Sequence, residues 1–165
     1  MKLTDLTLRK ALELAATIEE TAAQRYEALA EKFSGDETLA TVFSQLAQDE
    51  AAHGSHFTDL AQGLPNEAAL ADKEEALDLL RASAASAVLS PKSLSQMDDV
   101  RSPADALHKA LEVEKATLFF YQSLKDVMDQ SKEVDHLIET EKRHISTLMK
   151  VLVTDARFRG LDDVW

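Results

Sequence analysis

Six ionisable residues interrupt apolar stripes that repeat at helical spacing, and no other feature of this chain constrains its fold as strongly. They comprise two lone glutamates and two Glu-x-x-His pairs, namely Glu19, Glu114, Glu50/His53 and Glu141/His144. An ionisable group that faces a core is costly unless a partner compensates it. The pattern therefore predicts helices that enclose one shared polar site.

Apolar residues in steps of three and four predict four long helices, over about residues 8–33, 39–64, 103–128 and 134–151. The short breaks after the first and third helices predict two antiparallel helix hairpins. The expected fold is an all-α four-helix bundle, with residues 1–165 forming a single domain.

Two connections between these helices can be interpreted from their residues. The first is Ser34-Gly35-Asp36, in which Ser34 or Asp36 can cap the second helix. The second, residues 65–102, is far too long for a tight turn, so it could span the length of the bundle. Because residues 66 to about 90 still look helical, we expect a short crossover helix there.

Composition and charge exclude several classes of protein. Four Gly and three Pro in 165 residues, with abundant Ala, Leu and Glu, favour helices. A net charge of −12 argues against nucleic acid or anionic lipid as a partner. No stretch approaches the roughly 20 apolar residues of a membrane span, and the first residues lack the apolar run of a signal peptide. We expect a cytoplasmic protein that binds neither nucleic acid nor membrane.

The ligand types at the six positions suit a pair of divalent metal ions. Residues three apart on a helix share a face, so each Glu-x-x-His pair can reach one metal region. Glutamate oxygen and neutral imidazole suit iron, manganese or zinc, and carboxylates can bridge two ions. Four glutamates contribute −4 and two divalent ions +4, so the filled site is neutral. Without metal, some of the carboxylates are expected to protonate.

The two halves of the chain repeat. Aligning them matches Glu19 with Glu114, Tyr26 with Tyr121, Glu50 with Glu141 and His53 with His144. The repeat predicts two hairpins related by a pseudo-twofold axis, with one metal ion per half. Each tyrosine lies seven residues after a lone glutamate on the same helix face. Each tyrosine could serve in core packing, or it could donate a hydrogen bond to a ligand carboxylate or a bound oxygen species. The symmetry favours the hydrogen bond.

Other histidines near these motifs are not assigned to metal. Glu133/His136 and Asp105/His108 have similar spacing but flank the apolar stripes, which predicts solvent-facing pairs. His56, which lies three residues after the first motif, is interpreted as a partly exposed histidine, with a place beside the ligands as the alternative.

The strings IEETAAQRY, LAQDEAAH, VEKATLFFY and IETEKRH resemble the rubrerythrin-like branch of the ferritin-like superfamily. The resemblance implies a ferritin-like four-helix bundle, frequently dimeric, that holds two iron ions and reacts with peroxide or dioxygen. The metal ligands that it implies are Glu19, Glu50, His53, Glu114, Glu141 and His144.

Two departures from the family pattern bear on function. Typical rubrerythrins append a rubredoxin domain, but this chain has no cysteine, so its electrons would come from a separate donor. Rubrerythrin peroxidases also carry another carboxylate where this chain has Thr117 and, by symmetry, Ala22.

The leading hypothesis is a di-iron oxidoreductase that reduces hydrogen peroxide or dioxygen. The alternatives are ferritin-like iron handling with ferroxidase activity, a substrate hydroxylase, and a helical interaction protein without metal.

Overall fold

The computed structural model describes residues 6–65, 74–88, 99–128 and 132–158. The helices in these ranges are α1 Leu8–Lys32, α2 Glu37–Gln62, α3 Glu74–Val88, α5 Pro103–Val127 and α6 Lys132–Phe158. No strand occurs among the described residues, so the predicted all-α class is confirmed. None of the described helices combines the length and the apolar character that a membrane span requires.

Side-chain caps determine where two of the bundle helices begin. The Asp36 carboxylate accepts a hydrogen bond from the N–H of Leu39 at 3.1 Å, so Asp36 rather than Ser34 caps α2. The Ser102 hydroxyl accepts one from the N–H of Asp105, also at 3.1 Å, at the start of α5. These bonds satisfy N–H groups that have no partner inside the helix.

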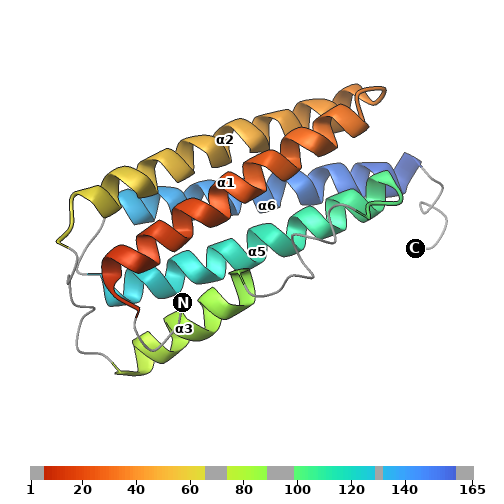
Figure 1. The fold of residues 1–165 in the computed structure, drawn as a ribbon. Helices are drawn as coiled ribbons and strands as arrows, with labels where there is room; N and C mark the ends of the chain where they lie inside the picture. The colour runs from red at the N-terminus through yellow and green to blue at the C-terminus, as the bar shows by residue number, and fades with distance from the viewer. Residues whose placement is uncertain (1–5, 66–73, 89–98, 129–131, 159–165) are drawn as a thin grey trace.

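The helices form the two predicted antiparallel hairpins, α1 with α2 and α5 with α6 (Figure 1). The two hairpins also contact each other, α1 with α5 and α2 with α6, and together they form a four-helix bundle. In Figure 1, α2 and α5 run in the same direction, so α5 begins at the end of the bundle opposite to the one where α2 ends. The crossover helix α3 packs against α5. Its predicted first residues, 66–73, lie outside the described part of the chain.

The core consists of two apolar clusters with a polar layer between them. On α1, residues from Ala11 to Ile18 belong to one cluster and residues from Ala22 to Leu29 to the other, and Glu19 lies between them. The other three bundle helices change cluster at Glu50, Glu114 and Glu141. Because each large apolar side chain that is fully buried contributes about 1.5–3 kcal/mol, the clusters hold the polar layer in place from both sides.

Candidate metal centre

The structure brings all six predicted residues together in this polar layer. Each of the four bundle helices supplies a glutamate, and α2 and α6 each add a histidine one turn later. All six residues are buried, with exposed fractions of 8 % or less. The look-alike residues Glu133, His136 and His108 are exposed and His56 is half-buried, as their places beside the stripes predicted.

The six residues form two overlapping groups. One group contains Glu19 and His53, and the other contains Glu114 and His144. Both groups also include Glu50 and Glu141, and within each group the potential ligand atoms lie within 4.8 Å of one another. Each half of the chain therefore supplies one lone glutamate and one histidine to its own group, while the glutamates of the two motifs are shared.

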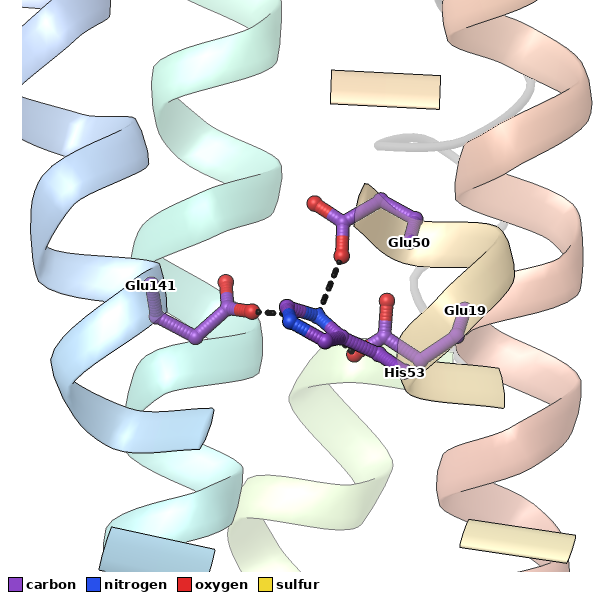
Figure 2. Close-up of side chains that lie close together, drawn as sticks. All are labelled: Glu19, Glu50, His53 and Glu141. Atoms are coloured by element: carbon purple, nitrogen blue, oxygen red, sulfur yellow. Dashed lines mark hydrogen bonds and ion pairs between the residues drawn. The ribbon is translucent and has the colours of Figure 1, made fainter. Parts of the chain in front are cut away.

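Glu50 lies between the two imidazole rings. Its Oε2 is 2.9 Å from Nδ1 of His53, and its Oε1 is 3.1 Å from Nδ1 of His144. Figure 2 shows the first of these contacts, with Glu141 approaching His53 from α6. The ring centroids of the two histidines are 5.8 Å apart. One carboxylate thus reaches both groups with different oxygens, which is the geometry a bridging ligand requires.

Glu141, the second shared carboxylate, has one oxygen engaged and one without a hydrogen bond. Its Oε2 accepts a hydrogen bond from the Thr117 hydroxyl at 3.2 Å. Its Oε1 is buried and accepts no hydrogen bond from the described residues, although Nδ1 of His53 lies 3.3 Å away. A buried carboxylate oxygen without a donor is costly. A cation between these side chains would satisfy it, so the residues present fit a metal ion.

Both tyrosines bind lone glutamates, but each binds the glutamate of the opposite half. Tyr26 on α1 donates to Glu114 on α5, and Tyr121 on α5 donates to Glu19 on α1. Both rings are fully buried. The hydrogen-bonding interpretation of the tyrosines therefore agrees with the structure, whereas the crossed pairing was not evident from their spacing.

The electrostatics of the cluster reflect crowded carboxylates in a buried layer. Burial raises the pKa of Glu19 and of Glu114 well above the usual value, and the charges of Glu50 and Glu141 raise it further. Burial also opposes ionisation of Glu50, but hydrogen bonds from His144 and His53 outweigh it and lower the pKa of Glu50 to about 2.

The two histidines are strongly basic in this environment. Burial lowers the pKa of an imidazole, but the adjacent carboxylates of Glu141 and Glu50 outweigh it and raise the pKa of His53 to about 9. Hydrogen bonds with Glu114 and Glu50 likewise outweigh burial and raise the pKa of His144 to about 11. At neutral pH the metal-free cluster therefore retains protons on both imidazoles, and the raised pKa values of Glu19 and Glu114 favour the protonated forms of these carboxyls. These protons balance the negative charge that divalent cations would otherwise neutralise.

Sequence reasoning missed one residue in this network. Oδ2 of Asp49 lies 3.1 Å from Nε2 of His144, on the side of the ring that faces away from the cluster. Asp49 directly precedes Glu50, and that adjacency was the available signal. A carboxylate at the outer nitrogen fixes the orientation of a ligating imidazole and increases its basicity.

Comparisons with known proteins agree with this geometry. The model of the rubrerythrin family matches residues 10–152, a range that contains all six clustered residues and both tyrosines. No curated protein and no solved structure matches the chain.

Proposed function

The chain belongs to the rubrerythrin family, and on this premise we propose that it is a non-haem di-iron oxidoreductase that reduces hydrogen peroxide or dioxygen. The observation that supports the proposal most directly is the membership of Glu50 and Glu141 in both ligand groups. Two shared carboxylates distinguish a dinuclear centre from two independent mononuclear sites.

The six clustered residues would divide between two ions. Glu19 and His53 would hold one ion, Glu114 and His144 the other, and the two shared glutamates would reach both. Manganese or zinc could use the same oxygen and nitrogen donors. Iron is proposed because it is the metal of the family and, unlike zinc, changes oxidation state.

Bound as Fe(II), two ions would supply the two electrons that, with two protons, reduce one hydrogen peroxide to two water molecules. The chain's own residues position the ligands and exclude water. Tyr26 keeps its proton on Oη at neutral pH, because burial and the Glu114 charge raise the pKa of its hydroxyl well above the usual value. It therefore acts as a hydrogen-bond donor that orients Glu114. The two apolar clusters exclude water from both ends of the layer.

Electrons for repeated turnover would come from a separate donor, because a chain without cysteine cannot carry a rubredoxin-type centre. We also propose that residues 1–165 form one domain and that the protein is a cytoplasmic homodimer. Light scattering on the purified chain tests the oligomeric state.

An anaerobic titration tests the proposed reaction. The metal-free protein is loaded with Fe(II), bound iron is counted, and hydrogen peroxide is added in substoichiometric steps. We expect two iron ions per chain and one peroxide consumed for every two Fe(II) oxidised, followed by ferric absorbance in the near ultraviolet. Loaded protein that leaves peroxide unconsumed would refute the peroxidase proposal.

A matched pair of histidine variants links that reaction to the cluster. His144 and His136 lie on the same helix, but His144 is buried in the cluster and His136 is exposed. We expect His136→Ala to retain the iron content and peroxide consumption of the parent protein. His144→Ala should lose iron and slow peroxide consumption by at least tenfold, as expected when a ligand is removed.

Iron oxidation for iron handling is the second candidate function. It is favoured by Thr117, which stands where rubrerythrin peroxidases carry a further carboxylate and which contacts a shared glutamate through its hydroxyl. This function predicts that the chain takes up more than two iron ions aerobically and forms a large assembly. A dimer with no uptake beyond two ions per chain would argue against iron storage.

A further inference from the structure

The two histidines of the cluster differ at their outer nitrogens. Nε2 of His144 lies 3.1 Å from the carboxylate of Asp49. Nε2 of His53, by contrast, has no hydrogen-bond or ion-pair partner among the described residues. The polar contacts of the His53 ring with those residues are all made by Nδ1. The pseudo-twofold repeat therefore breaks down just outside the six clustered residues.

The residues that break the symmetry can be identified from the repeat. Asp49 directly precedes the shared glutamate of α2, and Thr140 occupies the matching position on α6. Thr140 accepts a hydrogen bond from Nη2 of Arg143 at 2.7 Å, whereas Ala52 is the match of Arg143 on α2. The first half thus places a carboxylate behind the histidine of the second half. The second half offers only a hydroxyl, with a guanidinium cation beside it.

The same side of the cluster opens to the surface. A groove of about 820 Å³ lies between α2 and α6, and its lining includes Asp49, His53, Thr140 and Arg143 but not His144. The side chain of His53 is 10 % exposed, against 6 % for that of His144, and of the two only His53 lines the groove. Water and small solutes in the groove can therefore reach His53.

We propose that the two metal positions are inequivalent, with Glu114 and His144 retaining their ion while Glu19 and His53 exchange theirs with solvent through this groove. The inference rests on the proposed function, because it requires the six clustered residues to be ligands of divalent cations. A carboxylate at the outer nitrogen keeps the imidazole in place and strengthens it as a ligand.

Chelator kinetics on the loaded protein test the proposal. The metal-free chain is loaded anaerobically with two equivalents of Fe(II), and a chromogenic ferrous chelator is added in excess. We expect one equivalent of iron to be released rapidly. The second should be released about 10- to 100-fold more slowly, which is the range by which outer hydrogen bonds to metal ligands change affinity.

Reciprocal variants assign the two phases. Asp49→Asn should accelerate the slow phase alone, and Asp49→Glu should restore most of the slow release because it keeps a carboxylate. Thr140→Asp places a carboxylate at the position on α6 that matches Asp49, in the groove that His53 lines, and should slow the fast phase. A merely structural role for Asp49 would instead accelerate both phases. Circular dichroism checks that each variant remains helical.

The outcomes separate this proposal from the proposed function. Release of both equivalents in a single phase, or a fast phase that Thr140→Asp leaves unchanged, would overturn the inequivalence while a dinuclear centre stands. A chain that binds no Fe(II) at all would refute both proposals. We also expect His53→Ala to retain one slowly released ion. His144→Ala should not retain this ion.

Discussion

The hydroxyl of Tyr26 on α1 donates a hydrogen bond to the carboxylate of Glu114 on α5. Tyr121 on α5 donates in turn to Glu19 on α1. Each tyrosine therefore orients the lone glutamate of the other half of the chain. This crossed pairing joins the two hairpins through the polar layer, so the packing of α1 against α5 and the geometry of the cluster depend on each other.

Replacing Tyr26 by phenylalanine tests this coupling. Tyr26→Phe leaves a buried oxygen of Glu114 without its donor, which should lower the free energy of unfolding of the metal-free chain by about 1–3 kcal/mol. It should also weaken the metal position of the second half, although Tyr26 lies in the first. Urea unfolding measures the stability, and the slow phase of iron release reports the metal position.

Tyr121→Phe is the matched control, because its hydroxyl binds Glu19 and should affect the other metal position. If both variants altered the same phase of iron release, the crossed pairing would not determine how the ions are held.

The fold could be predicted because several independent features of the sequence indicate the same helices. Apolar stripes, short breaks and capping residues such as Asp36 all indicate the same boundaries. The six clustered residues could be predicted equally well, because a glutamate or histidine within an apolar stripe is conspicuous. Glu50 and Glu141 were assigned to the site from their Glu-x-x-His motifs, their place in the apolar stripes and the repeat, but their sharing between two groups became evident only in three dimensions.

The residues that surround the cluster could not be predicted in the same way. Tyr26 lies two helical turns from Glu19, so spacing alone pairs it with its own helix. Its true partner, Glu114, is 88 residues away and is selected by the antiparallel packing of α1 and α5. Asp49 looks like an ordinary surface acid beside a stripe, and its partner lies 95 residues away. Such contacts depend on how the helices pack.

Metal loading should release protons. In the metal-free protein, His53 and His144 have pKa values of about 9 and about 11, and the pKa values of Glu19 and Glu114 are raised well above the usual value. Because metal ions bind the deprotonated forms of these groups, loading at pH 7 should release at least the two imidazole protons per chain, and the raised pKa values of Glu19 and Glu114 add to this release. A pH indicator in weakly buffered solution measures the release. Loading with no proton release would show that these side chains are not the ligands.

The same groups determine how the stability of the metal-free chain depends on pH. Both imidazoles bind protons more tightly in the folded than in the unfolded chain, where their pKa is about 6.5. The stability they contribute is therefore complete below pH 6.5, and it is lost as the pH rises through about 9 for His53 and about 11 for His144. The raised pKa values of Glu19 and Glu114 act in the same direction.

Glu50, whose pKa is lowered to about 2, contributes stability that is lost only in acid. Thermal unfolding with chelator present should therefore show a lower Tm at pH 9.5 than at pH 7. The iron-loaded protein should lose less over this interval, because its ligands are already deprotonated. A metal-free Tm that rises over this interval would contradict the protonation of the cluster.

Thr117 should limit the reaction with peroxide. Thr117→Glu would place a carboxylate next to Glu141, at the position where rubrerythrin peroxidases carry one, and should increase the rate of peroxide consumption by loaded protein. Without metal, the added buried carboxylate should lower stability, because burial and like charges both disfavour it. Stopped-flow peroxide consumption and chelator-treated thermal unfolding measure the two effects.

Thr117→Val is the control for that substitution. It removes the hydroxyl that contacts Oε2 of Glu141 without adding a ligand. It should therefore not increase peroxide consumption. If Thr117→Glu bound iron but consumed peroxide no faster than the parent protein, the missing carboxylate would not explain how this chain differs from the peroxidases of the family.

The membership of Glu50 and Glu141 in both ligand groups predicts how substitutions change the number of iron ions bound per chain. Glu50 belongs to both ligand groups, whereas Glu19 belongs to one. Glu19→Gln should therefore retain about one tightly bound Fe(II) per chain, while Glu50→Gln should weaken both positions by tenfold or more. Equilibrium dialysis against Fe(II) under argon measures both, and Glu133→Gln on the exposed face of α6 serves as the control. Loss of only one ion from Glu50→Gln would mean that Glu50 serves a single position, and the centre would then contain one bridging carboxylate instead of two.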